Sequence, residues 1–326
     1  MDRFELRLPK GRTRKSASRP AILLVAVSAF AACAWYLVRR FQWHEVFAYL
    51  SRVDFLKLVV SVCVVHLVYI VIRTWRWQVV VGHANPGVRF FELYWITAIV
   101  VSLANVTPGQ LGEALKIELL KRRGLLGRLP GIGGFITERL MDLLVVAAMG
   151  AAGLVFGSGV HARYPGLATA IGVVLAVCAV ALYALRLRPA GPASRWVAEI
   201  RRGSGSPLVW TKMLVLSLAS WTFVGLGWQI SLLAAGIHIS LFEILWFIAL
   251  VTLGTLLSFV PAGLGVTEVL AFASLADMGI PDVTAQAGAM MMRVYGLIIV
   301  GFGLLHWALW LLYLHFGGRA PAGAAE

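Results

Sequence analysis

The sequence predicts an all-α, polytopic membrane protein with about six transmembrane helices and two re-entrant hairpins that form an inverted repeat. Three observations support this fold class. First, 60% of the residues are hydrophobic and the mean hydropathy is +0.84, whereas soluble domains are about half apolar. Second, long apolar segments recur along the chain. Third, two similar apolar runs each end in a break rich in proline and glycine.

Six segments have the composition and length of transmembrane helices, for which about 20 mainly apolar residues are needed. The first of them follows a basic region, so a signal peptide is its alternative interpretation. Its apolar length and the poor cleavage sequence FAAC favour a span that stays in the protein. The predicted spans are, in chain order, Ala21–Val38, Leu56–Ile72, Pro130–Phe156, Leu167–Leu185, Met213–Ala235 and Val283–Phe316.

Two further apolar runs, Phe91–Val106 and Phe242–Val260, differ from these spans. Each ends in a Pro/Gly-rich break and is followed by a stretch that is only modestly apolar. We interpret each run as one arm of a re-entrant hairpin. An interfacial loop between two ordinary spans is the alternative, because non-helical backbone inside a membrane is tolerated only against protein or a water-filled cavity.

The formal net charge of +14 reflects basic residues that lie between the hydrophobic segments. Most of them fall in the N-terminal tail and in the connections 73–128 and 186–212, which predicts that these regions and both termini are cytoplasmic. The pattern sets orientation and does not predict a nucleic-acid partner. We expect a basic tail at 1–20, one transmembrane domain at 21–316 and a disordered tail at 317–326, in the bacterial cytoplasmic (inner) membrane.

Sequence signatures of catalysis and of cofactor binding are missing. Cys33, Cys63 and Cys178 lie inside predicted spans at no metal-ligand spacing. There is no H-E-x-x-H, no G-x-S-x-G and no phosphate loop with Gly-Lys-Ser/Thr, so no hydrolase or ATP-driven pump is indicated. We therefore expect no catalytic residue, no metal site and no cofactor.

An internal repeat relates the two halves of the chain. FELYWITAIV, which starts at Phe91, aligns without a gap to FEILWFIALV, which starts at Phe242. Downstream, PGQLGE is matched by PAGLGVTE, and the next helix of each half contains an arginine. Three predicted spans separate the copies, so the second copy, around 208–316, is expected to be upside down relative to the first, around 56–156. Inverted repeats of this kind are common in secondary transporters; chance similarity between two Trp- and Leu-rich runs is the alternative.

The first break, TPGQLGEALK, predicts a new helix start. Thr107 suits the N-cap, Pro108 suits the first helical position, and Gln110 completes a capping box. A helix start exposes unpaired N–H groups and a partial positive charge, which favour an anion. Four glycines at the two breaks would let backbone or a head group approach closely; they are Gly109, Gly112, Gly263 and Gly265, of which the latter two follow Pro261.

Charged residues inside the apolar segments are candidate site residues, because an isolated charge at the centre of a transmembrane helix costs roughly 2.5–3.5 kcal/mol. Glu138, Arg139 and Asp142 share one helical neighbourhood; snorkelling to the cytoplasmic side is the alternative. Arg293 has no acidic neighbour on its own face and needs a carboxylate from elsewhere or a ligand phosphate. Candidate partners are Glu113 and Glu268, and Lys116 adds a cation near the first, although ordinary interfacial pairing of Glu113 with Lys116 remains open.

A second basic motif, RTWRW, places Arg73 and Arg76 at the predicted cytoplasmic end of a span. Arginine and tryptophan commonly anchor a helix at the membrane interface. We favour this anchoring role over binding of a lipid head group.

RTWRW, TPGQLGEALK, TERLMDLL, VPAGLGVTE and MMRVYG together resemble the lysylphosphatidylglycerol synthase transmembrane, or flippase-like, family, which includes the membrane half of multiple peptide resistance factors and the hopanoid-biosynthesis-associated membrane proteins. Gln110 stands where many relatives have a basic residue, which weakens a phosphate contact there. The resemblance implies a domain that binds lipids or lipid-linked intermediates and moves them between leaflets. Lysyl-lipid synthases also carry a soluble catalytic domain, which this chain lacks up to Glu326, so it is not expected to be an enzyme.

We therefore expect a flippase-like transporter of an anionic phospholipid, hopanoid or polyprenyl-type lipid, with membrane lipids as partners. A secondary transporter of a small polar solute or ion is one alternative. An accessory subunit that works with lipid-biosynthesis enzymes is another. The candidate site residues are Thr107, Pro108, Gly109, Gly112, Glu113, Lys116, Glu138, Arg139, Asp142, Pro261, Gly263, Gly265, Glu268 and Arg293.

Overall fold

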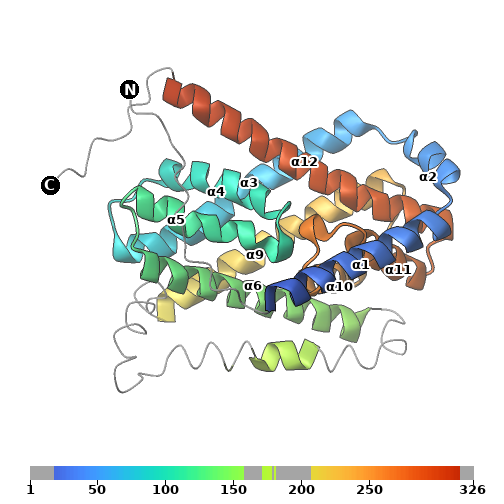
Figure 1. Ribbon diagram of the computed structural model, residues 1–326, viewed down its shortest axis with the longest axis horizontal. Coiled ribbons are helices and arrows are strands. Elements are labelled where there is room, and N and C mark those ends of the chain that lie inside the picture. Colours follow the sequence, from blue (N-terminus) through green and yellow to red (C-terminus); the bar gives the residue numbers. More distant parts are fainter. Residues whose placement is uncertain (1–17, 158–170, 178–179, 181–206, 316–326) are drawn as a thin grey trace.

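The computed structural model describes residues 18–157, 171–177, 180 and 207–315, and every regular element in this part of the chain is a helix (Figure 1). The predicted all-α, polytopic fold class is confirmed. The elements are α1 (Ser18–Arg40), α2 (Trp43–Leu50), α3 (Phe55–Ala84), α4 (Phe90–Ala104), η1 (Pro108–Ala114), α5 (Leu115–Arg122), α6 (Arg128–Phe156), α9 (Pro207–Ala234), α10 (Leu241–Ser258), η2 (Pro261–Gly263), α11 (Val266–Asp277) and α12 (Asp282–His315).

Within the described residues, five helices are long and apolar enough to cross a membrane. Four of them, α3, α6, α9 and α12, coincide with predicted spans, and α1 covers the predicted first span. The fifth is α10, whose 18 residues have the length of a crossing, whereas α4 has only 15 residues. The predicted span Leu167–Leu185 lies largely outside the described residues, although 171–177 are helical. That the arms α4 and α10 belong to re-entrant hairpins stays a prediction.

The ends of these helices follow from local sequence. The Asp54 carboxylate accepts a hydrogen bond from the Lys57 N–H at 3.0 Å and caps α3. Ser240 and Glu243 form a capping box at the start of α10. This helix ends at Phe259, whose backbone is left-handed with φ 52°. A residue with left-handed backbone cannot continue a right-handed helix, so α10 stops before η2.

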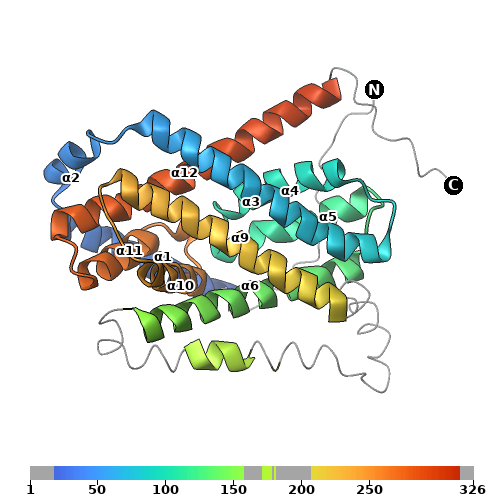
Figure 2. The ribbon, with the colours of Figure 1, turned by 180° about the vertical axis from the view of Figure 1, so that it is seen from behind.

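The same order of elements occurs twice, as α3–α4–η1–α5–α6 and as α9–α10–η2–α11–α12. The contacts between the halves are reciprocal: α3 packs against α9, η1 meets η2, α4 packs against α12 and α10 packs against α6. Figures 1 and 2 show that α3 and α9 run in opposite directions, as do α6 and α12. This is the packing expected of two related halves with opposite directions; their orientation in a membrane stays a prediction.

Glycines bring the helices of the two halves into close contact. A Cβ atom at Gly153 of α6 would lie 2.7 Å from the backbone nitrogen of Trp246 in α10. In the reciprocal pair, a Cβ atom at Gly303 of α12 would collide with the Cβ atom of Ser102 in α4. Small residues at such contacts let transmembrane helices approach closely, which favours their association by van der Waals packing.

Candidate functional site

A buried ion network joins α3, η1 and α6 in the first half. Arg76 of α3 is fully buried and donates to the Glu138 and Asp142 carboxylates, each at 2.5 Å, and to the Ser217 hydroxyl at 2.7 Å. Arg73, one turn earlier, contacts Glu113 of η1 at 2.6 Å and also reaches Glu138 and Asp142. Each charge of this network therefore has a partner of opposite sign, as a low-dielectric interior requires.

The carboxylates of this network are held from several sides. Glu138 and Asp142 are four residues apart on α6 and therefore share one face of the helix. Trp77 and Trp221 complete the shell, because their indole N–H groups donate to Glu138 at 2.8 Å and to Asp142 at 3.2 Å, respectively. The structure thus assigns Glu138 and Asp142 mainly to binding the arginines of α3.

The predicted interfacial role of Arg73 and Arg76 is wrong. Their relative exposures are 3% and 0%. In the motif RTWRW, Trp75 points outward and is half exposed, whereas Trp77 is buried with the arginines. The reason is helical periodicity: positions 73, 76 and 77 lie on the face of α3 that meets α6, and position 75 lies on the opposite face.

The first break differs in detail from its predicted capping box. The chain begins a 3-10 helix at Pro108, and Thr107 makes no side-chain bond of the N-cap type. Instead, the Thr107 hydroxyl accepts from the Gly112 N–H at 2.8 Å. A Cβ atom at Gly112 would approach Thr107 and the backbone of Ala104, so glycine permits this turn. The backbone of Gly109 and Gln110 belongs to η1, and the Gln110 side chain lies outside the described part of the structure.

The second break carries a smaller charged site. Arg293 of α12 donates from Nε to Glu268 of α11 at 2.5 Å, so Glu268 is the one of its two candidate partners that it contacts. Its other nitrogens donate to the carbonyl oxygens of Ala262 at 3.0 Å and Gly263 at 3.4 Å. Ala262 has a left-handed φ of 55°, and φ is also positive at Gly263 and Gly265. Arg293 therefore ties a tightly turned break to α12.

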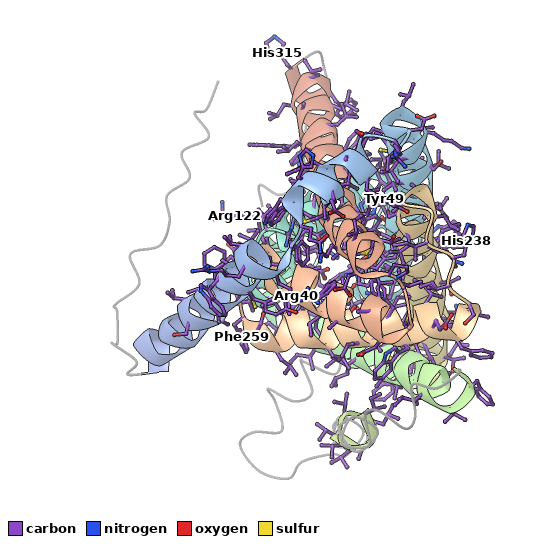
Figure 3. The ribbon with its side chains drawn as sticks, turned by 90° about the vertical axis from the view of Figure 1, so that its right-hand side faces the viewer. Arg40, Tyr49, Arg122, His238, Phe259 and His315 are labelled. Atoms are coloured by element: carbon purple, nitrogen blue, oxygen red, sulfur yellow. The ribbon has the colours of Figure 1, made fainter. Side chains whose placement is uncertain are left out.

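A cavity of about 300 Å³ lies between the two charged sites. The first site contributes Arg73, Glu113, Arg139 and Asp142 to its wall, and the second contributes Arg293. Arg139 contacts Glu113 at 2.5 Å and Asp142 at 3.2 Å, yet its side chain keeps 25% exposure; that of Arg293 keeps 20%. The two breaks meet at this cavity, because residues of both η1 and η2 line it. Figure 3 labels Phe259, where α10 ends before η2.

The structure brings together only part of the predicted site. Thr107, Glu113, Arg139, Asp142, Gly263 and Arg293 line the cavity. Glu138 is buried in the ion network instead. Lys116 is also buried: its ammonium has no hydrogen-bond partner among the described residues and lies 4.7 Å from the centre of the Trp77 ring. It does not pair with Glu113, which binds Arg73 and Arg139.

Three other predicted residues lie at positions that shape the backbone or the helix packing. Gly265 faces α1, where an added Cβ atom would lie 2.7 Å from the Cβ atom of Cys33. Pro261 begins η2, which matches its predicted position at the break. Pro108 begins η1 in the same way.

Several wall residues were missed by sequence reasoning. His66 and Tyr69 from α3 and Trp221 and Trp228 from α9 line the cavity beside the charges. His66 is 3% exposed, and its Nε2 atom has no hydrogen-bond partner in the described part of the chain. The one usable signal was the spacing of His66, Tyr69 and Arg73, which places them on one face of a helix.

The fold and the site are those of a membrane domain with a buried polar cavity between two related halves. Comparison with protein families identifies it further: residues 21–303 match the family model described as the lysylphosphatidylglycerol synthase TM region. The chain belongs to this family. A comparison with the curated proteins gave no match.

Proposed function

We propose that this protein binds an anionic lipid, or a lipid-linked intermediate with an anionic head group, and moves it between the two leaflets of the membrane. The observation that carries the proposal is the cavity between η1 and η2, which exposes Arg139 from one half and Arg293 from the other. Guanidinium groups bind phosphate in a bidentate, charge-assisted manner. The acyl chains would stay in the bilayer while the head group occupies the cavity.

Membership of the family and the reciprocal packing of the halves support transport between leaflets. In transporters with inverted repeats, one half rocks against the other around a site near the middle of the bilayer. Here the cavity lies where the breaks of the two halves meet, so the same rocking would open it to one leaflet and then to the other.

Lipid movement in vesicles tests the proposal. The purified protein is reconstituted into phosphatidylcholine vesicles with a trace of phosphatidylglycerol that carries a fluorescent acyl chain, and an impermeant quencher reports the outer leaflet. We expect Arg139→Ala and Arg293→Ala to slow the exchange about ten- to a hundredfold, because each removes a contact worth about 1.5–3 kcal/mol to a charged group. The exposed variant Arg122→Ala is the control. Lipid exchange at the wild-type rate in both cavity variants contradicts the assignment.

A small polar solute or ion is the second candidate substrate. Its support is the cavity volume of about 300 Å³, which is at the lower end for sites of drug-sized ligands and suits a head group or a free anion. Uptake of labelled sulfate by the same vesicles, without lipid exchange, would favour this candidate. An accessory role beside lipid-biosynthesis enzymes predicts neither sulfate uptake nor lipid exchange. An enzyme would yield a lipid of changed mass, whereas transport leaves the lipid unchanged.

A further inference from the structure

The two arginines that face the cavity are held in different ways. Arg139 shares its carboxylates with other cations, since Glu113 and Asp142 also bind Arg73. Arg293 contacts a single carboxylate within the described residues, that of Glu268. An anion that binds Arg139 enters a network that already balances its charges, whereas an anion that binds Arg293 has to compete with one partner.

The ion pair of Arg293 with Glu268 uses only part of each group. Glu268 binds through Oε1, and its Oε2 atom is buried without a hydrogen-bond partner in the described part of the chain. Arg293 spends its remaining described hydrogen bonds on two carbonyl oxygens of the turn at η2. A phosphate group offers several acceptor oxygens and can bind a guanidinium through two parallel bonds. A phosphate can therefore accept more hydrogen bonds from Arg293 than the Glu268 carboxylate does.

Displacement would leave Glu268 in a place that disfavours its charge. Glu268 is 5% exposed. Three helices pack against α11: α12 supplies Arg293, α1 places the Cys33 thiol nearby, and α10 has Glu243, in its first turn, as its one ionisable residue. No second cation contacts Glu268 among the described residues. A buried carboxylate that loses its counter-charge is neutralised by protonation rather than kept ionised.

We propose that an anionic phosphate group displaces Glu268 from Arg293 and that the released Glu268 carboxylate takes up one proton from the buffered solvent. This rests on the proposed function and adds to it a built-in competitor and a link to protons. The anion and the proton enter together, so the charge of the second site is conserved. When the anion leaves, Glu268 releases the proton and binds Arg293 again.

Proton uptake is measurable by titration calorimetry of the purified protein with short-chain phosphatidylglycerol in buffers that differ in ionisation enthalpy. We expect about one proton per bound lipid and therefore an affinity that falls by up to about tenfold per unit rise in pH. Glu268→Gln should bind without proton uptake, independently of pH, and more tightly than wild type at about pH 8. Cys33→Ala, which removes the neighbouring thiol, should retain the proton uptake.

Binding of phosphatidylglycerol to the wild type without proton uptake overturns the proposal, as does an unchanged proton count in Glu268→Gln. The number of protons that the wild type takes up per bound lipid tests the proposal even if Glu268→Gln does not fold. Sulfate is titrated in parallel as a free anion with a constant charge: uptake of a proton with sulfate and no binding of the lipid supports the exchange at Arg293 but contradicts lipid transport. Movement of lipid between the leaflets of vesicles, together with lipid binding that takes up no proton, contradicts the displacement of Glu268 but leaves the proposed transport function standing.

Discussion

At the scale of single residues, the first half depends on complementary charges that are almost completely buried. Arg76 binds two carboxylates and a hydroxyl and has no exposed surface. The buried pairs hold α3, η1 and α6 together, and they form the wall behind Arg139. Their main effect is to fix the positions of these elements, because the desolvation of buried ions offsets much of the attraction between them.

Removal of one charged partner should lower the free energy of unfolding by far more than the whole network contributes to it on balance. We predict that Arg76→Ala lowers the free energy of unfolding by about 3–5 kcal/mol, because Glu138 and Asp142 each lose a buried partner. Denaturant titration in detergent measures this change. The control is Arg122→Ala, which removes an exposed pair with Glu118 and should cost less than about 1 kcal/mol. Equal losses in both variants would show that the network is not buried in the folded protein.

At the scale of elements, reciprocal helix contacts join the halves. The close approaches at Gly153 and Gly303 place α6 against α10 and α12 against α4. Both contacts include a helix that leads to a break, so their geometry also sets where η1 and η2 meet. The cavity therefore depends on helix packing at some distance from its wall.

A methyl group at one of these contacts tests this dependence. We predict that Gly303→Ala destabilises the protein by about 1–3 kcal/mol, because the added Cβ atom collides with Ser102. Gly301, two residues earlier in α12, has no neighbour within 4 Å of an added Cβ atom. Gly301→Ala should therefore be neutral or stabilise by up to about 1 kcal/mol through better helix propensity. Thermal unfolding measures the stability of both variants. If Gly303→Ala is as stable as the wild type, α12 and α4 do not make this close contact.

At the scale of the whole molecule, the two halves run in opposite directions, and the basic residues predict which side faces the cytoplasm. The turn after α2 and the connection after α5 should then lie on opposite sides of the membrane. Ser51 is exposed directly after α2, and Lys121 is exposed in the last turn of α5, next to its connection.

Single-cysteine labelling tests this topology. In a background without Cys33, Cys63 and Cys178, we predict that Ser51→Cys reacts with an impermeant maleimide in intact spheroplasts, because its connection carries few basic residues. Lys121→Cys should react only after the membrane is opened, because it lies in a strongly basic connection. Labelling of both positions from the same side contradicts the predicted topology of the first half.

Much of the architecture could be predicted because it depends on local properties of the chain. Apolar length identified the helices α3, α6, α9 and α12, and proline with glycine identified both breaks. The repeat also led to Glu268 as a partner of Arg293, because the same order of break, carboxylate and arginine occurs in each half. The roles of Arg73 and Lys116 were not predictable in this way. Each role depends on which side chains of distant helices are within reach.

The sequence by itself determined the membrane setting, the all-helical class, the two breaks and most of the charged residues near the cavity, because hydrophobic length and backbone preferences act within short segments. Only the tertiary structure decided that Arg73 and Arg76 face inward and that Lys116 sits behind the wall. It also decided that Arg139 and Arg293 share one cavity. The physical reason is that the rotation of each helix about its axis is set by packing against neighbouring helices of both halves, and that rotation determines which charges can meet.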